Sequence, residues 1–440
     1  MPSLQYSREV PVRSSVDVFV AGGGPAGIAA AIAAARQGAS VFLAEGHTCF
    51  GGMGTAGMVP AMMMFADGVN FVADGIGREV WDKILAVQGL PADHNSAYKT
   101  VNIWTEGLKR IYDEMILDSG IDFSFQTQVI SIEKTTPKKL SHAVCSAKSG
   151  LFAIEAKVFV DCTGDGDLAV WAGAPYEKGD ADGNLMAGTL CSLWADIDWE
   201  GMPQQNAREK LPQAIEDGVF SKPDLHLPGI GPVGKRLGGG NIGHVYDLDG
   251  TDERSLTRGL IWGRKTMPEY ERYYKEYLKG FEKMQLAATG SLLGVRETRR
   301  IMGDYVLNLD DFKSRAVFDD EIGRYSYPVD IHASDASAKS YAQFEKEYTT
   351  LRYEAGENYG IPYRTLVTKG LDNLLVAGRC ISSDRYIQSS IRVMPGCFIT
   401  GQAAGIAAAM AAHGNTDTRG IQVKELQRRL ASMGAYLPNI

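Results

Sequence analysis

The chain has 440 residues, of which 45% are hydrophobic and 22% charged, a composition that excludes disordered, collagen-like and disulfide-scaffold proteins. At roughly 150 residues per domain, this length predicts two or three domains, or one large domain with an insert. Forty-five Lys and Arg against fifty-three Asp and Glu leave a formal net charge of -8, which would repel nucleic acids and anionic lipids. We therefore expect neither a nucleic acid nor a membrane as a partner.

The cysteines and the N-terminus favour a cytoplasmic protein. The six cysteines include no Cys-x-x-Cys pair, so they predict neither a disulfide framework nor a zinc site, and we expect no metal. Residues 1–15 are polar and lack the apolar stretch of a signal peptide, so we expect the mature chain to begin at Met1. Residues 18–35 and 393–412 are uncharged and long enough to span a membrane, but their Gly, Ala and Pro content favours buried helices.

Residues 16–45 predict one β-α-β unit. A β-rich strand is expected at residues 16–21, an alanine-rich helix at 28–37 and a second strand at 40–45. The turn after the first strand carries glycines in the spacing Gly-x-Gly-x-x-Gly, at positions 22, 24 and 27. The first glycine turns the chain, the second lets the backbone approach a pyrophosphate, and the third packs the helix on the strand.

These features together predict a dinucleotide site. The pyrophosphate would lie at the helix N-terminus, where free N–H groups favour an anion. Glu45 ends the second strand, where an acidic side chain binds a ribose hydroxyl. A second match at Gly238, Gly240 and Gly243 has no apolar strand before it and no alanine-rich helix after it. We expect a loop there, and no separate NAD(P)H domain.

The next part of the chain predicts a helix and then a meander. Residues 105–118 place their apolar side chains on one helical face. The period then changes to two, and residues 123–132, 143–147 and 151–156 predict a small antiparallel meander. A separate strand is expected at residues 157–161.

From about residue 173 the pattern predicts a second domain and then a return to the first. Long helices are expected near residues 253–283, with a break before Pro268, and near residues 338–355. A strand at residues 373–377 and a long alanine-rich helix up to about His413 resume the first domain. A tail helix follows around residues 423–430.

Several further segments resemble the FAD-dependent oxidoreductases of the glutathione-reductase-like superfamily. The resemblance is greatest to a broad bacterial family described only as FAD-dependent oxidoreductase, and it covers nearly the whole chain. Besides the opening unit, the segments are Gly51-Gly52-Met53-Gly54-Thr55-Ala56-Gly57, Cys162-Thr163-Gly164-Asp165-Gly166-Asp167, and residues 294–305, 326–332 and 373–405.

The resemblance implies an α/β fold and bound FAD. We expect a Rossmann-like FAD-binding domain, a parallel sheet with a β-meander, formed by residues 1–172 and 365–440. Residues 173–364 would form a mixed α+β substrate or cap domain. The residues expected at FAD are Gly22, Gly24, Pro25, Ala26, Gly27, Glu45, Gly51, Gly52, Met53, Thr55, Val129, Thr163, Gly164, Asp165, Gly378, Val393 and Met394.

Some of these residues have an expected role at one part of the cofactor. Val129 would present its backbone to the adenine, and residues 163–165 would lie near the ribityl and pyrophosphate groups. Val393 and Met394 would place backbone N–H groups at the pyrimidine edge of the flavin. The dipole of the final helix would then stabilise an anionic reduced flavin.

The flavin carries the redox chemistry, so the protein is expected to supply orientation, charge and a proton path. We predict His332 as general base or substrate ligand, with His244 as the second choice. Arg392, just before the final helix, would hold an anionic substrate or the reduced flavin. His47 and Cys49 lie where some related proteins attach flavin covalently, but non-covalent binding is favoured.

The function predicted is hydride transfer between a small organic substrate and flavin N5, with an unknown electron acceptor. An NAD(P)H-fed reductase or monooxygenase is one alternative. A non-redox nucleotide-binding protein and a tRNA-modifying flavoprotein are others. Neither the substrate nor the oligomeric state follows from the sequence, because a fold does not specify them.

Overall fold

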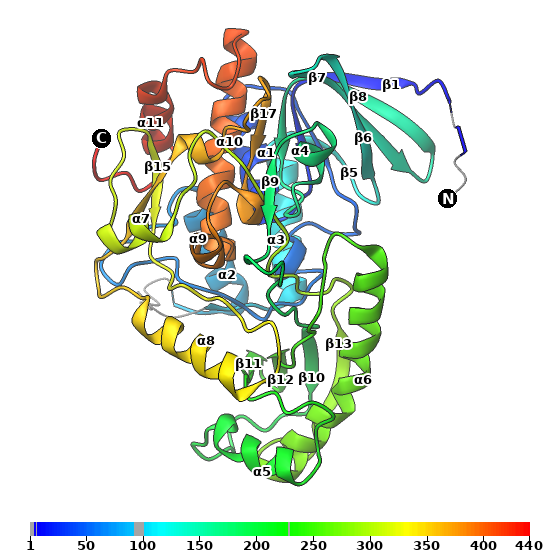
Figure 1. Ribbon diagram of the computed structural model, residues 1–440, viewed down its shortest axis with the longest axis vertical. Helices are drawn as coiled ribbons and strands as arrows, with labels where there is room; N and C mark the ends of the chain where they lie inside the picture. The colour runs from blue at the N-terminus through cyan, green and yellow to red at the C-terminus, as the bar shows by residue number, and fades with distance from the viewer. Residues whose placement is uncertain (1–3, 6, 92–100, 228) are drawn as a thin grey trace.

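The largest sheet combines strands from both ends of the chain. The computed structural model describes residues 4–5, 7–91, 101–227 and 229–440. Seven strands form this sheet in the order β5-β2-β1-β8-β7-β6, with β17 also paired to β8 (Figure 1). Their bounds are β1 (Val12–Ala21), β2 (Val41–Ala44), β5 (Asp122–Ser124), β6 (Gln128–Thr136), β7 (Lys139–Ala147), β8 (Gly150–Asp161) and β17 (Leu374–Val376).

The parallel part and the meander share strand β8. The sequence predicted two strands at residues 151–161, and this was wrong, because β8 runs without interruption for 12 residues. Its first half pairs antiparallel with β7, while its second half pairs in parallel with β17. Strand β1 lies parallel along its other side. No turn is needed, since one strand serves both parts of the sheet.

The parallel strands all end at the same edge of the sheet. Ala21, the last residue of β1, is in register with Ala44 in β2 and with Asp161 in β8. Asp161 is in turn in register with Val376 in β17. The segments that follow these four residues therefore emerge side by side, at the carboxyl edge where ligands of parallel sheets bind.

Helices α1 (Pro25–Arg36) and α10 (Met394–Gly414) pack closely on each other and on β1 and β8. A Cβ added to Gly401 would lie 2.3 Å from the carbonyl oxygen of Ala26, and one added to Gly405 would lie 2.1 Å from that of Ala30. The two helix backbones are therefore in direct contact.

Helix α10 is also the one described helix that is long and apolar enough to cross a membrane by length and composition. Of its most apolar 18-residue window, 94% is buried inside the protein. This burial is what the core helix of a folded domain shows.

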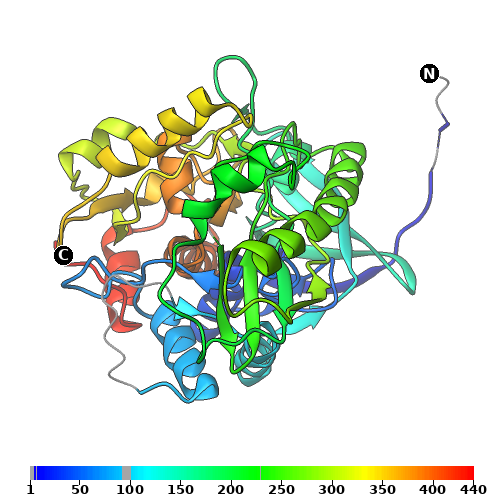
Figure 2. The ribbon, with the colours of Figure 1, turned by 90° about the horizontal axis from the view of Figure 1, so that it is seen from below.

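A second, antiparallel sheet lies below the first in Figure 1. Its order is β11-β12-β10-β13, from β10 (Ser192–Ala195), β11 (Gly229–Gly234), β12 (Leu237–Asn241) and β13 (Gln285–Thr289). It has its own hydrophobic core with α5 (Leu211–Glu216) and α6 (Glu253–Tyr277). Seen from below, the green and yellow segments that carry α5, α6 and α8 (Ala338–Thr350) lie across the rest of the molecule (Figure 2).

Two sequence predictions in this region were wrong. Helix α6 continues through Pro268 for 25 residues instead of breaking. The buried side chains of Met267, Tyr270 and Tyr274 lie on either side of the proline, and their packing outweighs the lost backbone hydrogen bond. The second glycine-rich segment, around Gly240, is strand β12 rather than a loop.

Glycines of β12 let neighbouring groups approach the strand. Added Cβ atoms would lie 2.4 Å from Ile197 at Gly238, 2.3 Å from Pro60 at Gly239 and 2.6 Å from Ser192 at Gly240. The next helix along the chain, α6, contains no alanine. These glycines therefore serve packing within an antiparallel sheet.

The segment 301–361 packs on the first sheet and its helices. Many of its apolar residues belong to the same hydrophobic core as α1 and α10. The domain boundaries predicted from the sequence stay a prediction.

The other strands are β3 (Ala61–Met62), β4 (Val101–Asn102), β9 (Tyr176–Lys178), β14 (Arg299–Ile301), β15 (Glu321–Tyr325) and β16 (Tyr359–Pro362). The other helices are α2 (Ile76–Gln88), α3 (Thr105–Asp118), α4 (Asp167–Trp171), α7 (Leu309–Ser314), α9 (Arg385–Ile391) and α11 (Val423–Ser432), with short 3-10 turns at Gly52–Gly54, Ala207–Lys210, Tyr363–Thr365 and Gly378–Cys380.

The contact between α1 and α10 predicts the effect of a single methyl group. Gly405→Ala should lower the free energy of unfolding by about 1–3 kcal/mol, because the new Cβ would overlap the Ala30 carbonyl. Gly414→Ala, at the end of the same helix, is the matched control, since its Cβ would meet only Thr416 at 3.6 Å. Urea unfolding followed by circular dichroism measures both. Equal effects of the two substitutions would contradict this account of the contact.

Candidate functional site

The first glycine-rich turn contains both a packing glycine and an open one. A Cβ added to Gly27 would lie 1.8 Å from the carbonyl oxygen of Gly22, so the fold itself requires this glycine. Gly24 is the N-cap of α1, and a Cβ added there would meet nothing within 4 Å. Pro25 and Ala26 begin the helix beside it. The space at Gly24, at a helix N-terminus, fits a pyrophosphate.

Two other segments meet this turn. The N–H of Gly51 donates to the carbonyl of Gly23 at 2.8 Å. A Cβ added to Gly52 would lie 3.4 Å from the Cα of Gly24, and one added to Gly54 would lie 2.8 Å from the sulfur of Met394. The loop that contains Met53 and Thr55 thus lies between the N-termini of α1 and α10, where Val393 is the N-cap. Sequence reasoning predicted all three segments at FAD, and the structure brings them together.

At the other end of the site, Glu45 is buried at the end of β2. Its carboxylate accepts hydrogen bonds from the N–H groups of Gly23 and His47, both at 2.7 Å. The N–H of Thr127 donates to the carbonyl of Glu45 at 3.0 Å. Val129, predicted at the adenine, lies two residues further on in β6, so the structure places its strand beside Glu45. Each carboxylate oxygen keeps a second lone pair with which it can accept a ribose hydroxyl.

The loop after β8 is held by charged side chains. Asp165 accepts hydrogen bonds from Thr298 at 2.7 Å and from Arg379 at 2.6 Å. Arg379 also donates to the carbonyl of Gly164 at 2.9 Å. Gly378 precedes it with a φ of +82°, and its added Cβ would lie 2.9 Å from Ala26. The predicted residues 163–165 and Gly378 therefore lie together beside the start of α1.

Asp161 fixes the start of this loop from inside the protein. It accepts hydrogen bonds from the N–H and hydroxyl of Thr163, at 3.0 and 2.7 Å, and from the N–H of Ala169 at 2.9 Å. Burial raises the pKa of Asp161 to about 6, although these hydrogen bonds act in the opposite direction.

Arg392 lies immediately before the N-cap of α10, and its side chain is 11% exposed. One of its terminal nitrogens lies 3.1 Å from a carboxylate oxygen of Asp330 and 3.1 Å from the carbonyl of Asp330. Its Nε is buried and has no hydrogen-bond partner within the described residues. Burial would raise the pKa of Asp330, but His332, Arg392 and Arg296 hold it well below its usual range.

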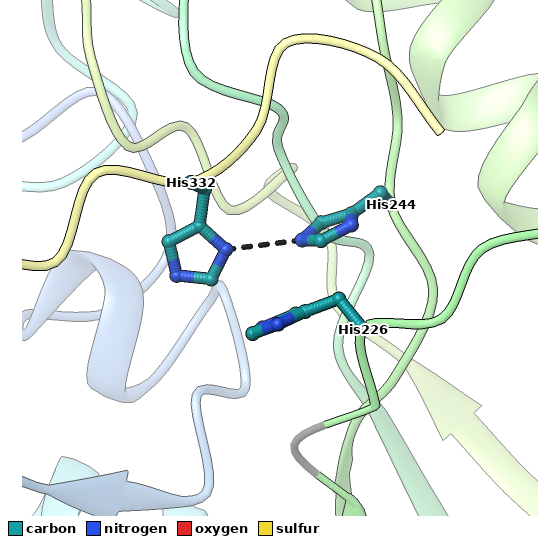
Figure 3. Close-up of side chains that lie close together, drawn as sticks. All are labelled: His226, His244 and His332. Carbon is teal, nitrogen blue, oxygen red and sulfur yellow. Dashed lines mark hydrogen bonds between the residues drawn. The ribbon is translucent and has the colours of Figure 1, made fainter. Parts of the chain in front are cut away.

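His332 and His244, the two predicted catalytic histidines, are in contact, and a third histidine joins them. Nε2 of His244 lies 3.0 Å from Nδ1 of His332 (Figure 3). His226 stacks on His244 with ring centroids 4.8 Å apart. His332 also faces Asp330, with 3.4 Å from Nε2 to Oδ1, and His244 faces Asp224, with 2.9 Å from Nδ1 to Oδ2.

Burial keeps these imidazoles neutral. Burial, His244 and Arg296 lower the pKa of His226 to about 3. The pKa of His332 is lowered well below its ordinary value by burial and by Arg296, while Asp330 opposes the shift. Burial lowers the pKa of His244 as well, although Asp224 opposes it. Neutral imidazole is the form that accepts a proton or binds a metal.

Three arginines lie within five residues of sequence, at positions 296, 299 and 300, and they differ in their partners. Arg299 pairs with Asp167 at 2.6 Å, and Arg300 pairs with Glu297 at 2.7 Å, so both stabilise the fold. Arg296 donates instead to the carbonyl of Ala187 and the hydroxyl of Thr189. Burial, and next to it the charge of Arg392, lower the pKa of Arg296 to about 10.

Sequence reasoning missed Asp224 and His226. Both lie between α5 and β11, in a segment with no motif and no periodicity to set it apart. The only local signal is their spacing of two residues, which lets the His226 N–H donate to the Asp224 carboxylate at 3.0 Å. His47 is half-buried, and Cys49 is buried with its sulfur 3.8 Å from the Thr55 hydroxyl. These positions do not test covalent attachment, so non-covalent binding of flavin stays a prediction.

The open space at Gly24 predicts separable effects on folding and on cofactor binding. Gly24→Ala should leave the stability of the FAD-free protein unchanged, because its Cβ meets no protein atom. Its affinity for FAD should fall about ten- to hundredfold, since the methyl group occupies the pyrophosphate space. Gly27→Ala should instead destabilise the FAD-free protein. Fluorescence titration of FAD and thermal unfolding measure both effects, and a stability loss in Gly24→Ala would contradict the prediction.

Asp161 predicts a pH dependence of stability. Its folded pKa of about 6 exceeds the unfolded value, so the folded state binds more protons and loses stability as the pH rises from about 4 to 6. The loss should reach about 3 kcal/mol, at about 1.4 kcal/mol per pKa unit. The difference in unfolding free energy between wild type and Asp161→Asn should therefore shrink or reverse over this range. Asp118→Asn, at an exposed site, should show no such change; a difference for Asp161→Asn that is independent of pH would refute the assignment.

Comparison with known proteins identifies the family. A family profile described as FAD dependent oxidoreductase matches residues 17–430. No curated protein matches the chain. Among solved structures, the chain is similar to a geranylgeranyl bacteriochlorophyll reductase-like protein from Thermoplasma acidophilum. That alignment has 12% identity, covers 96% of this chain and 82% of the other, and gives a TM-score of 0.45.

Two further solved structures have comparable similarity. An anhydrotetracycline hydroxylase from Streptomyces rimosus has 12% identity and a TM-score of 0.44 over 95% of this chain and 66% of the other. A p-nitrophenol 4-monooxygenase from Pseudomonas putida has 12% identity and a TM-score of 0.43 over 95% and 84%. At this level of similarity none of the three informs the substrate. The family match over nearly the whole length shows that the chain belongs to the FAD-dependent oxidoreductases, enzymes whose cofactor is FAD.

Proposed function

We propose that the protein oxidises a small organic anion by hydride transfer to flavin N5, in a site built around Arg392. The observation that carries this proposal is the buried Nε of Arg392, which has no partner among the described residues. A buried guanidinium nitrogen without a partner costs free energy, so a ligand that binds it is favoured. Guanidinium groups bind carboxylates particularly well.

The order of the segments along the cofactor supports this position. Glu45 suits the adenosine end, and Gly24 suits the pyrophosphate, so the flavin end would lie towards the N-terminus of α10. Arg392 directly precedes that N-terminus. When bound, FAD supplies the hydride acceptor, and Arg392 would hold the substrate beside it.

The local charge also favours an anion. Arg392 and Arg296 contribute two positive charges, and Asp330 contributes one negative charge in contact with Arg392. An anionic substrate would balance the remaining positive charge within a buried site, where unpaired charges are costly.

His332 has a different role in this proposal from the one predicted from sequence. Its two ring nitrogens face Asp330 and His244, so neither is directed at Arg392. We therefore assign His332 as a positioning residue that holds Asp330, while Asp330 orients Arg392. His244 contacts the other ring nitrogen of His332, at 3.0 Å, and helps to hold that ring in place.

The setting of the reaction is also a proposal. The unpaired cysteines suggest work in the cytoplasm, and the net charge of -8 suggests no nucleic-acid or membrane partner. The partners would be the small-molecule substrate and a separate electron acceptor.

An anaerobic titration of the FAD-loaded protein tests the function. We expect the flavin absorbance to bleach with a hydroxy acid from a panel that also contains amines, polyols, NADH and NADPH. Arg392→Met should slow this reduction about ten- to hundredfold, because it removes a charged hydrogen bond worth about 1.5–3 kcal/mol, while FAD content is retained. Arg272→Met, on the exposed face of α6, is the control.

Two outcomes would overturn the proposal. Bleaching by NADPH alone would favour the reductase or monooxygenase alternative. Equal rates in Arg392→Met and wild type would remove Arg392 from the substrate site.

A further inference from the structure

Three histidines from distant parts of the sequence converge at one buried point. His226, His244 and His332 each offer a ring nitrogen, and these nitrogens all lie within 4.8 Å of one another. Each of the three residues is at most 7% exposed. His226 lies between α5 and β11, His244 follows β12, and His332 follows β15, so the tertiary structure alone assembles the cluster (Figure 3).

The polar neighbours of the cluster can direct two nitrogens towards one gap. His244 Nε2 and His332 Nδ1 lie 3.0 Å apart, and the tautomer of each ring decides which nitrogen donates. The outer nitrogens also have polar neighbours: His244 Nδ1 lies 2.9 Å from an Asp224 oxygen and 3.1 Å from the Tyr246 hydroxyl, and His332 Nε2 lies 3.4 Å from an Asp330 oxygen. When Asp224 and Asp330 accept the two outer N–H groups, the facing nitrogens present lone pairs to the same gap, where a cation can bind.

His226 adds an independent observation. Its Nε2 is buried and has no hydrogen-bond partner within the described residues. A buried polar atom without a partner costs free energy, and in a native structure it calls for an unseen ligand. This orphaned nitrogen belongs to the ring stacked directly on His244.

We propose that His226, His244 and His332 form a binding site for a divalent transition-metal ion of the zinc, cobalt or iron class. Neutral imidazole suits these borderline ions, whereas calcium and magnesium prefer oxygen ligands. Asp224 and Asp330 hold the outer nitrogens of two of the ligands, an arrangement that fixes the orientation and the protonation of metal-binding histidines. No cysteine takes part, which is why the cysteine pattern predicted no metal.

The surroundings can accommodate the ion. Asp224 and Asp330 place two negative charges beside the cluster. Arg296 lies close enough to lower the pKa values of His226 and His332. A recess lined by Asp224, His226, His244, Tyr246, Asp335 and Tyr341 borders the cluster and offers an entry path. Binding requires the His226 ring to tilt out of its stack on His244, since the two planes now differ by 14°.

The proposed ion would be connected to the flavin region through Asp330 and Arg392. His332 faces Asp330, which pairs with Arg392 at 3.1 Å. The metal would therefore fix the position of Asp330 and, through it, of Arg392. This site goes beyond the proposed oxidation, which requires no metal.

Metal content tests the proposal independently of any enzyme activity. The full-length, FAD-loaded protein is stripped with a chelator, incubated with Zn²⁺ or with Co²⁺, and dialysed. We expect one metal ion per chain by elemental analysis. With Co²⁺ we expect ligand-field absorption bands at wavelengths longer than the flavin band.

His226→Gln should weaken metal binding by at least about 100-fold, as loss of a first ligand exceeds the about 10- to 100-fold cost of outer-shell changes. His226 is chosen because it contacts none of the residues assigned to substrate. His413→Gln, at the exposed end of α10, is the matched control and should bind like wild type. Asp224→Asn provides a second variant, with an intermediate loss. FAD content and circular dichroism report whether each variant is folded.

The proposal fails if the folded wild type retains no stoichiometric metal, or if His226→Gln binds as tightly as wild type. A metal-free cluster in which nitrogen NMR shows an imidazolium would mean that a shared proton fills the gap, and this would also overturn it. Metal content is measured without any flavin reduction, so the failure of this proposal and the failure of the proposed function are distinguishable.

Discussion

The backbone contact between α1 and α10 is the constraint on which the cofactor region depends. Gly401 and Gly405 allow the carbonyl groups of Ala26 and Ala30 to approach to distances that any side chain would block. Because the helices are this close, both of their N-termini lie at the carboxyl edge of the parallel sheet. The start of α1 then meets the glycine-rich loop at residues 51–57, and the start of α10 meets its other side. This is the arrangement expected for FAD, with its pyrophosphate at the start of α1 and its flavin towards the start of α10.

A second constraint is the need to pair buried charged and polar side chains. Asp224, His244, His332, Asp330 and Arg392 follow one another in contacts of 2.9 to 3.4 Å. Each would be costly to bury alone, so each holds the next in place. The line crosses from the region of the antiparallel sheet to the N-terminus of α10. These two regions are therefore joined by polar contacts as well as by apolar packing.

Local sequence rules failed where tertiary packing opposed them. Pro268 stays inside α6, since the aromatic residues around it are buried in the second core. The glycines around Gly240 form a strand because side chains from neighbouring segments fill the space that a Cβ would need. Their spacing matches a nucleotide motif, but the crowding at each of these glycines shows that they serve packing.

The sequence by itself determined the first β-α-β unit and the final helix, because these depend on local spacing and periodicity. The choice of FAD came from the resemblance to a family, which rests on motifs spread along the chain. A glycine turn, a strand and an alanine-rich helix are specified by residues a few positions apart, and Glu45 follows from the end of a strand. The histidine cluster could not be found this way. His244 and His332 are 88 residues apart in sequence, and His226 carried no motif. Only the tertiary structure decided that they meet, because their approach depends on how the second sheet packs beside the first and on which buried charges must be paired.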